Sequence, residues 1–234
     1  MVRIQSCARG AAASALLLTA WLGIGLPAAG MLLGRRSWGA SSREAIGTIT
    51  HVHLEGDPAT IGTAHGLLAG DLITNLEADM TATFVDRVPS LAARHLILGM
   101  VAFNNRSLVH HFTSDELTEI SASTTAHGAA WDTLRSLGPS FSRGLQYHAL
   151  HDISQYLIDN PLVRPIQVGC TALAVGGSRT INGHLLVGRL FDFEGGPRFD
   201  LDKVVFTVRP EHGIPFVHVC WGGMSGAVTG FNQA

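Results

Sequence analysis

The stretch that decides the fold is GCTALAV at Gly169–Val175, followed by NGHLLVGRLFD at Asn182–Asp192. Each part contains a short apolar run, and the residues between the two runs include the glycine, serine and asparagine that are typical of turns. The pattern predicts an antiparallel pair of strands. Cys170 begins the first strand, and Arg189 and Asp192 lie at the end of the second, so the three side chains are expected at one end of the pair.

Further strands are predicted after this pair. Short apolar runs separated by turn residues continue to the last residues, which indicates an antiparallel meander. Asn232 is expected in a turn. Because the run of strands has only begun there, we expect a longer protein, with a sheet that is incomplete in this chain. The predicted strands are Thr171–Val175, Leu185–Leu190, Lys203–Val208, Phe216–Trp221 and Ala227–Phe231.

The first part of the chain is predicted to be mostly helical. A strand is expected at Ala45–Leu54, and Asp57 and Pro58 then mark the start of a long amphipathic helix that reaches Phe84. Helices followed by strands indicate an α+β fold. The other expected helices are residues 90–110, residues 113–134 with a capping box at Thr113 and Glu116, and residues 142–158.

The composition excludes several classes of protein. The chain has 234 residues, of which 46% are hydrophobic and 15% are charged, and its formal net charge is −2. This length suits one domain or two small ones with a sizeable core. Sixteen basic residues against eighteen acidic ones give no electrostatic footprint for nucleic acid, so no nucleic-acid partner is expected. Intrinsic disorder is excluded by the high hydrophobicity and low net charge.

The N-terminal segment predicts export. Nothing between Arg9 and Arg35 is charged, and the apolar stretch Ala11–Leu33 is long enough to cross a bilayer as one helix. Because Arg3 and Arg9 precede it, the stretch also has the form of an export signal. Both interpretations stay open: a cleaved signal of a secreted or periplasmic protein, or an uncleaved anchor that attaches the chain to a membrane through residues 11–33.

The Gly169–Cys170 junction offers an unusual solution for a thiol nucleophile, which needs a base. No Cys–His pair is obvious in the sequence. If the Gly169–Cys170 bond is cut, the new α-amine of Cys170 can act as the base, since its reference pKa is about 7.7–8.0. The thiol can make this cut itself by attacking the carbonyl of Gly169, which forms a thioester that water then opens.

These motifs resemble the N-terminal-nucleophile linear amide hydrolases, which include choloylglycine hydrolases, acid ceramidase-like amidases and the isopenicillin N acyltransferase family. The shared pattern is a Cys-Thr start and then a Gly-Arg-Asn-x-Asp run, here GRLFD at Gly188–Asp192. Upstream, GDPATIGTAHG at Gly56–Gly66 is similar to the opening of the acyltransferase family's pro-segment, and Gly230–Asn232 resembles its Gly-x-Asn element. The resemblance covers residues 45–234 and favours the acyltransferase-type family over the bile-salt hydrolases.

The resemblance implies a role for each matching residue. Cys170 would be the nucleophile and its freed amine the base, Asp192 would orient that amine, and Arg189 would sit beside the thiol and assist binding or balance charge. The chain departs from the pattern at Leu190, where the family has asparagine. The family's oxyanion asparagine is expected beyond residue 234, so an oxyanion role is not assigned to Asn232.

The resemblance also implies a fold and a division of the chain. The expected fold is the α+β αββα sandwich of N-terminal-nucleophile hydrolases, incomplete here, with pro-segment and catalytic segment associated after cleavage. The substrate would be a small-molecule linear amide or an acyl thioester, with no cofactor and no metal. The expected parts are a signal peptide or anchor at residues 1–34, a linker at 35–44, a mostly helical pro-segment at 45–169, and the start of the catalytic sheet at 170–234.

Two alternatives remain open from the sequence. The first is a membrane-anchored, metal-dependent hydrolase that uses the histidine-rich first half, where His51 and His53 share a strand face. Neither an HExxH motif nor a carboxylate at ligand spacing accompanies that pair. The second is an unprocessed, inactive binding protein of the same fold. Cys220 is predicted to be a core residue, and His65 to pack inside the helix rather than act in catalysis.

Overall fold

A computed structural model describes residues 35–128, 138–150, 152, 168–193 and 196–232. The predicted signal or anchor at residues 1–34 lies outside this part of the chain, as do the predicted helical residues 129–134 and 153–158. Residues 37–234 form one compact unit. Within the described residues, none of the helices combines the length and the apolar character needed to cross a bilayer.

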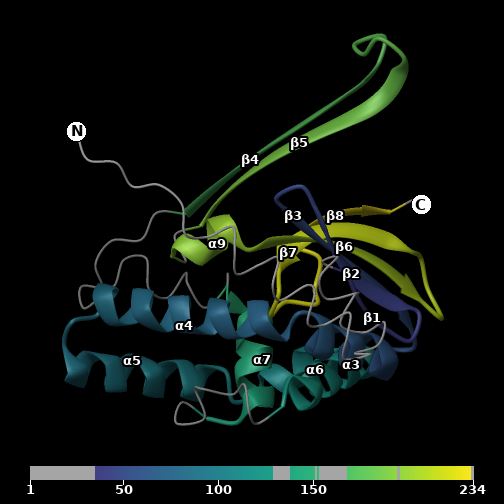
Figure 1. Cartoon of the computed structure of the whole chain (residues 1–234). Coiled ribbons are helices and arrows are strands. Elements are labelled where there is room, and N and C mark those ends of the chain that lie inside the picture. Colours follow the sequence, from purple (N-terminus) through teal and green to yellow (C-terminus); the bar gives the residue numbers. More distant parts are fainter. Residues whose placement is uncertain (1–34, 129–137, 151, 153–167, 194–195, 233–234) are drawn as a thin grey trace, which may run out of the picture. The chain divides into compact units, whose positions relative to one another are not determined.

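In the described part, the strands form a six-stranded sheet and a separate two-stranded sheet (Figure 1). The larger sheet has the order β1-β2-β3-β6-β7-β8, and the smaller one is the hairpin β4–β5. The members of the larger sheet are β1 (Arg36–Trp38), β2 (Ser41–Ile46), β3 (Ile49–Gly56), β6 (Lys203–Pro210), β7 (Phe216–Trp221) and β8 (Thr229–Asn232). Asn232 is therefore a strand residue rather than the predicted turn residue.

The predicted simple meander is wrong in its pairing. β4 and β5 pair only with each other, and β6 lies parallel to β3, with Val52 opposite Phe206. β6 then pairs antiparallel with β7, and β7 with β8, as a meander requires. The parallel pair forms because Val52, Leu54 and Phe206 project from the same face of the sheet into one core.

The predicted strand at Ala45–Leu54 is two strands. β2 ends at Ile46 and β3 begins at Ile49, and the two pair antiparallel with Ile46 opposite Ile49. Gly47 takes a φ of +63°, the left-handed conformation that glycine supplies in a tight hairpin turn. The segment expected as a linker at residues 35–44 contains β1 and the first part of β2.

The predicted long helix from Pro58 is also divided. It ends at Leu68 and a second helix begins at Gly70, because the chain bends at Ala69. The predicted start of this helix is confirmed: the Asp57 side chain accepts a hydrogen bond from the Thr60 amide at 2.7 Å. The capping box at residues 113 and 116 is present. The helices are α3 (Pro58–Leu68), α4 (Gly70–Arg87), α5 (Leu91–Asn104), η1 (Leu108–His111), α6 (Ser114–His127), α7 (Ser140–His148) and α9 (Pro197–Leu201).

Glycines let α3 and α6 pack backbone against backbone. A Cβ atom on Gly62 would clash with the Glu119 carbonyl oxygen, and one on Gly66 would clash with that of Ser123. The two glycines are four residues apart, so both lie on the face of α3 that meets α6. The part of the sequence that resembles the pro-segment opening therefore fixes a close helix–helix contact.

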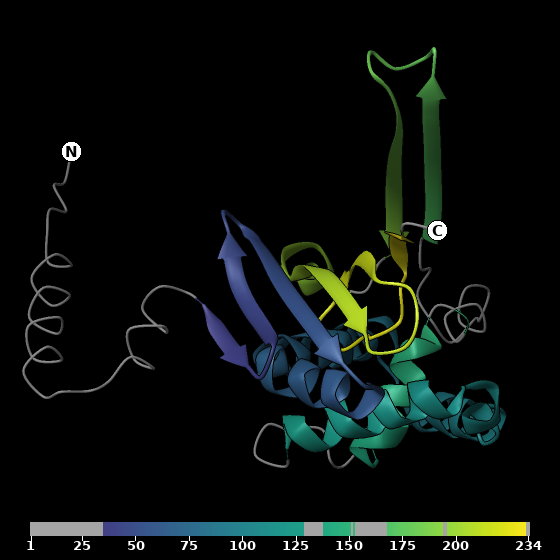
Figure 2. The same ribbon diagram turned by 90° about the vertical axis from the view of Figure 1, so that its right-hand side faces the viewer.

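The main core lies between the larger sheet and the helices on one of its faces (Figure 2). Alternate residues of β3 and β6 point into it, and α3 and α4 contribute the opposing side chains. This arrangement confirms the predicted α+β fold class. Its largest buried apolar members include Leu54, Phe206, Leu72, Leu76 and Trp221.

Candidate active site

Cys170 lies near the open end of the hairpin formed by β4 (Val168–Gly177) and β5 (Gly183–Phe193). The register places Gly169 opposite Asp192 and Cys170 opposite Phe191. The hairpin is thus as the sequence indicated; Arg189 lies on the same face of it as Cys170, whereas Asp192 lies on the other face with Gly169. Cys170 is exposed and its thiol is free, so the sulfur is accessible to a substrate.

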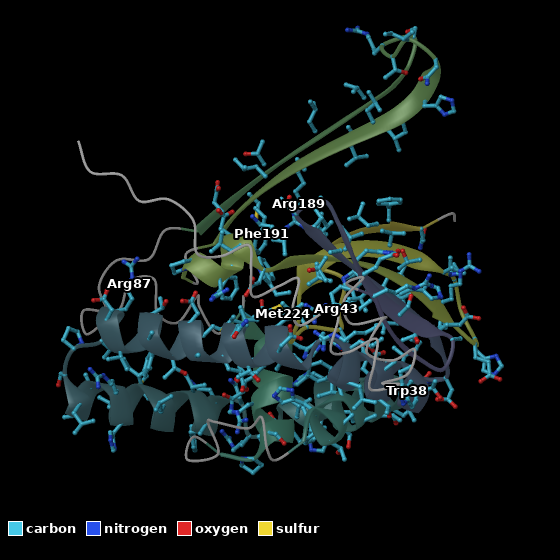
Figure 3. All side chains as sticks on the ribbon, in the orientation of Figure 1. Trp38, Arg43, Arg87, Arg189, Phe191 and Met224 are labelled. Atoms are coloured by element: carbon cyan, nitrogen blue, oxygen red, sulfur yellow. The ribbon has the colours of Figure 1, made fainter. Side chains whose placement is uncertain are left out.

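Arg189 joins the hairpin to the larger sheet. Its Nη2 lies 3.7 Å from the Cys170 Sγ, and its Nη1 donates hydrogen bonds to the Val228 carbonyl and, at 2.7 Å, to the Thr229 hydroxyl. Its guanidinium also lies 5.0 Å from the ring centre of Phe191 (Figure 3). The cation is therefore held beside the thiol by contacts on two sides.

Asp192 lies beside the predicted scissile bond. Its Oδ2 is 3.7 Å from the position that a Cβ atom on Gly169 would occupy, across the strand pair. The absence of a side chain at Gly169 keeps this space open. The carboxylate therefore lies on the Gly169 side of this bond, on the face of the hairpin opposite to the Cys170 side chain.

A pocket of about 250 Å³ adjoins Arg189. Arg189 supplies a positive charge on one wall, while most of the remaining lining is aromatic or aliphatic. The indole of Trp221 is fixed in that lining by a 2.7 Å hydrogen bond to the Phe199 carbonyl. The pocket is suited to an apolar group attached to a polar one. Its lining residues are Tyr147, His148, Leu150, Arg189, Phe191, Phe199, Trp221, Met224 and Val228.

Beneath this pocket, Glu77 forms a buried polar cluster with Arg143 and Tyr147. The Arg143 Nε donates to Glu77 Oε1 at 3.2 Å, and the Tyr147 hydroxyl donates to the same oxygen. Burial, together with the negative charge of Glu77, raises the pKa of Tyr147 well above its usual range. The phenol thus stays protonated and holds its place in the pocket wall. This cluster could not be predicted from the sequence because its members come from α4 and α7, 66 residues apart for the ion pair.

His148 is held by a second network that the sequence did not indicate. Its Nδ1 donates to the Gly144 carbonyl at 2.7 Å, and its Nε2 lies 2.9 Å from the Ser225 hydroxyl and accepts the Ser225 amide at 3.0 Å. Burial lowers the pKa of His148, so the ring is neutral. Burial raises the pKa of Glu119, which accepts from the Ser225 hydroxyl, to about 7. The network fixes the turn that follows β7 against α6 and α7.

The two other predicted structural residues are buried. The His65 Nε2 donates to the Gly222 carbonyl at 2.5 Å, and the ring packs edge-on against Phe206. Burial lowers the pKa of His65 to about 4. Cys220 is 1% exposed, and burial raises the pKa of its thiol to about 11. Both residues have the packing role that the sequence predicted, and Cys220 is unsuited to nucleophilic chemistry.

The histidines of β3 are satisfied by local partners. The His51 ring lies 3.0 Å from the Thr207 hydroxyl and 3.4 Å from Glu44, and the His53 ring lies 3.0 Å from Glu55. Among the residues that the structure describes, histidine, cysteine, aspartate and glutamate side chains do not gather in threes at a spacing that could hold a metal ion.

Comparisons with protein families and with curated proteins do not assign a function to this chain. The chain matches neither a protein family nor a curated protein.

Proposed function

We propose that the chain is a self-cleaving cysteine amidohydrolase or acyltransferase of the N-terminal-nucleophile type. The observation that carries this proposal is the surroundings of the Gly169–Cys170 bond, with the Arg189 cation beside the sulfur and the Asp192 carboxylate across from Gly169. Thiol, cation and carboxylate are the groups that the chemistry needs around this bond.

Self-cleavage begins with attack of the Cys170 Sγ on the Gly169 carbonyl carbon. The thiol proton passes to the leaving nitrogen, the C–N bond breaks, and a thioester joins the two residues. Water then adds to the thioester carbonyl and displaces the sulfur. The products are a carboxylate at Gly169 and, at Cys170, a free thiol with a new α-amine.

The same groups support turnover of a substrate. The α-amine of Cys170 takes the thiol proton, Asp192 holds the amine by a hydrogen bond, and Arg189 faces the negative charge that develops on sulfur. The substrate's acyl group passes to Sγ, with its apolar part in the adjoining pocket. Water or an amine then accepts the acyl group. The scheme uses no cofactor, and its substrates are linear amides or acyl thioesters.

The strand order supports an association of the two parts after cleavage. β3 precedes the Gly169–Cys170 bond and β6 follows it, and the two are paired along seven residue positions from Thr50 with Val204 to Gly56 with Pro210. A cut at residue 169 would therefore leave the fragments held in one sheet. Within this proposal the fold is the αββα sandwich, and residues 1–34 direct export as a cleaved signal or a membrane anchor.

The mass of the purified chain tests the proposal. We expect two fragments that separate after residue 169 under denaturing conditions, and a single uncut chain for Cys170→Ala. The control Cys220→Ala should cut as the wild type does, because that thiol is buried in the core. A wild-type chain that remains whole, or a Cys170→Ala chain that is cut at the same bond, contradicts self-cleavage.

A chemical label distinguishes the new terminus from an internal cysteine. A 2-cyanobenzothiazole condenses with a free 1,2-aminothiol, so it should label the fragment that begins with Cys170. Hydrolysis of N-acyl amides should then be abolished by thiol alkylation and unaffected by chelators. The opposite pattern, sensitivity to chelators alone, would support the metal-dependent alternative, and a whole chain without activity would support the binding protein.

A further inference from the structure

Helix α5 carries an apolar surface that faces solvent. We call this surface the α5 face. Its two most exposed large members are Leu91 at 65% and Phe103 at 64%. An exposed apolar patch of this kind marks a surface that contacts another molecule or a membrane. The α5 face consists of Leu91, Leu96, Leu98, Met100 and Phe103.

The opposite side of α5 is apolar as well. Ala93 and Ile97 are buried with Val88, and Phe84 and Val101 pack against them. α5 therefore has apolar residues both where it meets α4 and where it faces water. Large apolar side chains on the exposed side of a helix are ordinarily covered by another surface, so the α5 face indicates a second contact.

The charged side chains of the segment that contains the α5 face are all basic. Residues 88–113 contain neither aspartate nor glutamate, and they include Arg94, Arg106 and three histidines. The Arg106 guanidinium lies 4.1 Å from the ring centre of Phe103. Arg94 donates to the Val88 carbonyl at 2.6 Å, which fixes its cation at the start of the helix. Cations are thus held at both ends of the apolar surface.

The centre of the α5 face is open. A Cβ atom added to Gly99 would meet no atom within 4 Å, and a groove of about 370 Å³ runs past this glycine. The groove is bordered by Leu96, Met100 and Phe103. A shallow apolar groove between cationic ends fits an acyl chain whose headgroup is anionic.

We propose that α5 lies on the surface of a lipid bilayer that contains anionic headgroups, with the α5 face in the acyl boundary and Arg94 and Arg106 at the headgroup phosphates. A helix of this type is buried about 5–10 Å into the interface. The uniform charge disfavours a second copy, because a symmetric contact would bring arginine against arginine without a carboxylate between them. The proposal is independent of the chemistry at Cys170.

Hydrogen–deuterium exchange of the full chain with lipid vesicles tests this contact locally. Vesicles of phosphatidylcholine with phosphatidylglycerol should slow exchange in peptides from residues 91–104, and raised salt should reduce the effect. Pure phosphatidylcholine vesicles should protect these peptides less. The readout stays at α5 even if residues 11–33 attach the chain to the vesicle.

Paired variants sharpen the test. Met100→Ser with Phe103→Ser should remove the protection and weaken vesicle binding by α5 about tenfold or more, since two large apolar groups no longer enter the interface. Arg106→Gln, which leaves the apolar residues in place, should reduce the preference for anionic lipid. The matched control Leu185→Ser with Leu186→Ser changes exposed apolar residues of β5 and should leave the protection of α5 intact.

Three results would overturn the proposal. One is exchange in α5 that does not change with anionic vesicles. Another is protection that grows with protein concentration in the absence of lipid, which would assign the face to a second copy. The third is equal protection of the serine double variant, which would show that the apolar residues make no contact.

Discussion

Strands β6 and β5 are both rich in apolar residues, yet they lie in different surroundings. In β6, Val204, Phe206 and Val208 are at most 5% exposed, and the residues between them face the other side. In β5, the consecutive residues Leu185 and Leu186 are 69% and 58% exposed. The alternating apolar residues of β6 match a strand with one buried face. The continuous apolar run of β5 is typical of a strand that is covered on both faces. The stability of the described fold therefore resides in the larger sheet, and the chemistry that we propose for Cys170 belongs to the hairpin.

The largest difference between the two regions should appear on truncation of a core side chain. Phe206→Ala should lower the free energy of unfolding by about 3–5 kcal/mol, because Phe206 is 1% exposed and contacts both His65 and His218. Leu186→Ala in the hairpin should cost less than about 1 kcal/mol. Urea unfolding measures both, and equal losses would show that the hairpin supports the core.

Acid should destabilise the larger sheet through its buried histidines. Burial lowers the pKa of His65 and of His218 from 6.5 to about 4. Between about pH 4 and pH 6.5, the unfolded chain binds protons on these two histidines that the folded chain does not bind. The stability that the neutral histidines contribute is therefore fully present above pH 6.5 and is lost as the pH is lowered towards 4. Each histidine can contribute a loss of about 3 kcal/mol at most.

The variant His218→Phe checks this sign. It keeps a ring stacked on Phe206 and should be less sensitive to acid than the wild type in urea unfolding at pH 7 and pH 4.5. Cys220→Ala, in the same strand, should lower the free energy of unfolding equally at both pH values. A wild-type stability that rises on acidification would contradict the explanation.

Glycine-to-alanine substitutions should distinguish the close contact between α3 and α6 from the open surface of α5. Gly66→Ala should cost about 2–3 kcal/mol, because its Cβ atom would clash with the Ser123 carbonyl oxygen between α3 and α6. Gly99→Ala in α5 should be neutral or stabilising by up to about 1 kcal/mol, since its surroundings are open. Thermal unfolding of the two variants compares the same chemical change, and equal shifts in Tm would contradict the packing described for α3 and α6.

The smallest effect is expected at Glu119. Its raised pKa of about 7 means that the folded chain keeps a proton on this carboxyl that the unfolded chain loses above pH 4.5. Stability from this group is thus present below pH 4.5 and lost as the pH rises through 7. Glu119→Gln, which still accepts from Ser225, should be more stable than the wild type by about 1–2 kcal/mol at pH 8. Equal stabilities at pH 8 would show that the carboxylate is not destabilised there.

Much of the local structure could be predicted from the sequence. The caps at Asp57 and Thr113 and the strands around Cys170 are confirmed, because they depend on residues close together in the chain. The break at Ala69 could not be predicted from the spacing of apolar residues, which continues across it. That break depends on how α3 and α4 both reach one core, which is a tertiary requirement.

In the candidate site, too, some features could be predicted from the sequence and others could not. The approach of Arg189 and Asp192 to Gly169 and Cys170 follows from the register of one hairpin, so the sequence was sufficient for it. The contact of Arg189 with Val228, 39 residues away, and the pocket beside it required the structure.

The sequence by itself determined the α+β class, the caps at Asp57 and Thr113 and the hairpin that carries Cys170, Arg189 and Asp192, since local hydrogen bonds and apolar spacing govern these features. The tertiary structure alone decided that β6 lies parallel to β3 from the other part of the chain. The physical reason is that burial of apolar side chains stabilises any strand pairing that closes a common core. Several strands of this chain carry the alternating apolar pattern that such a pairing needs.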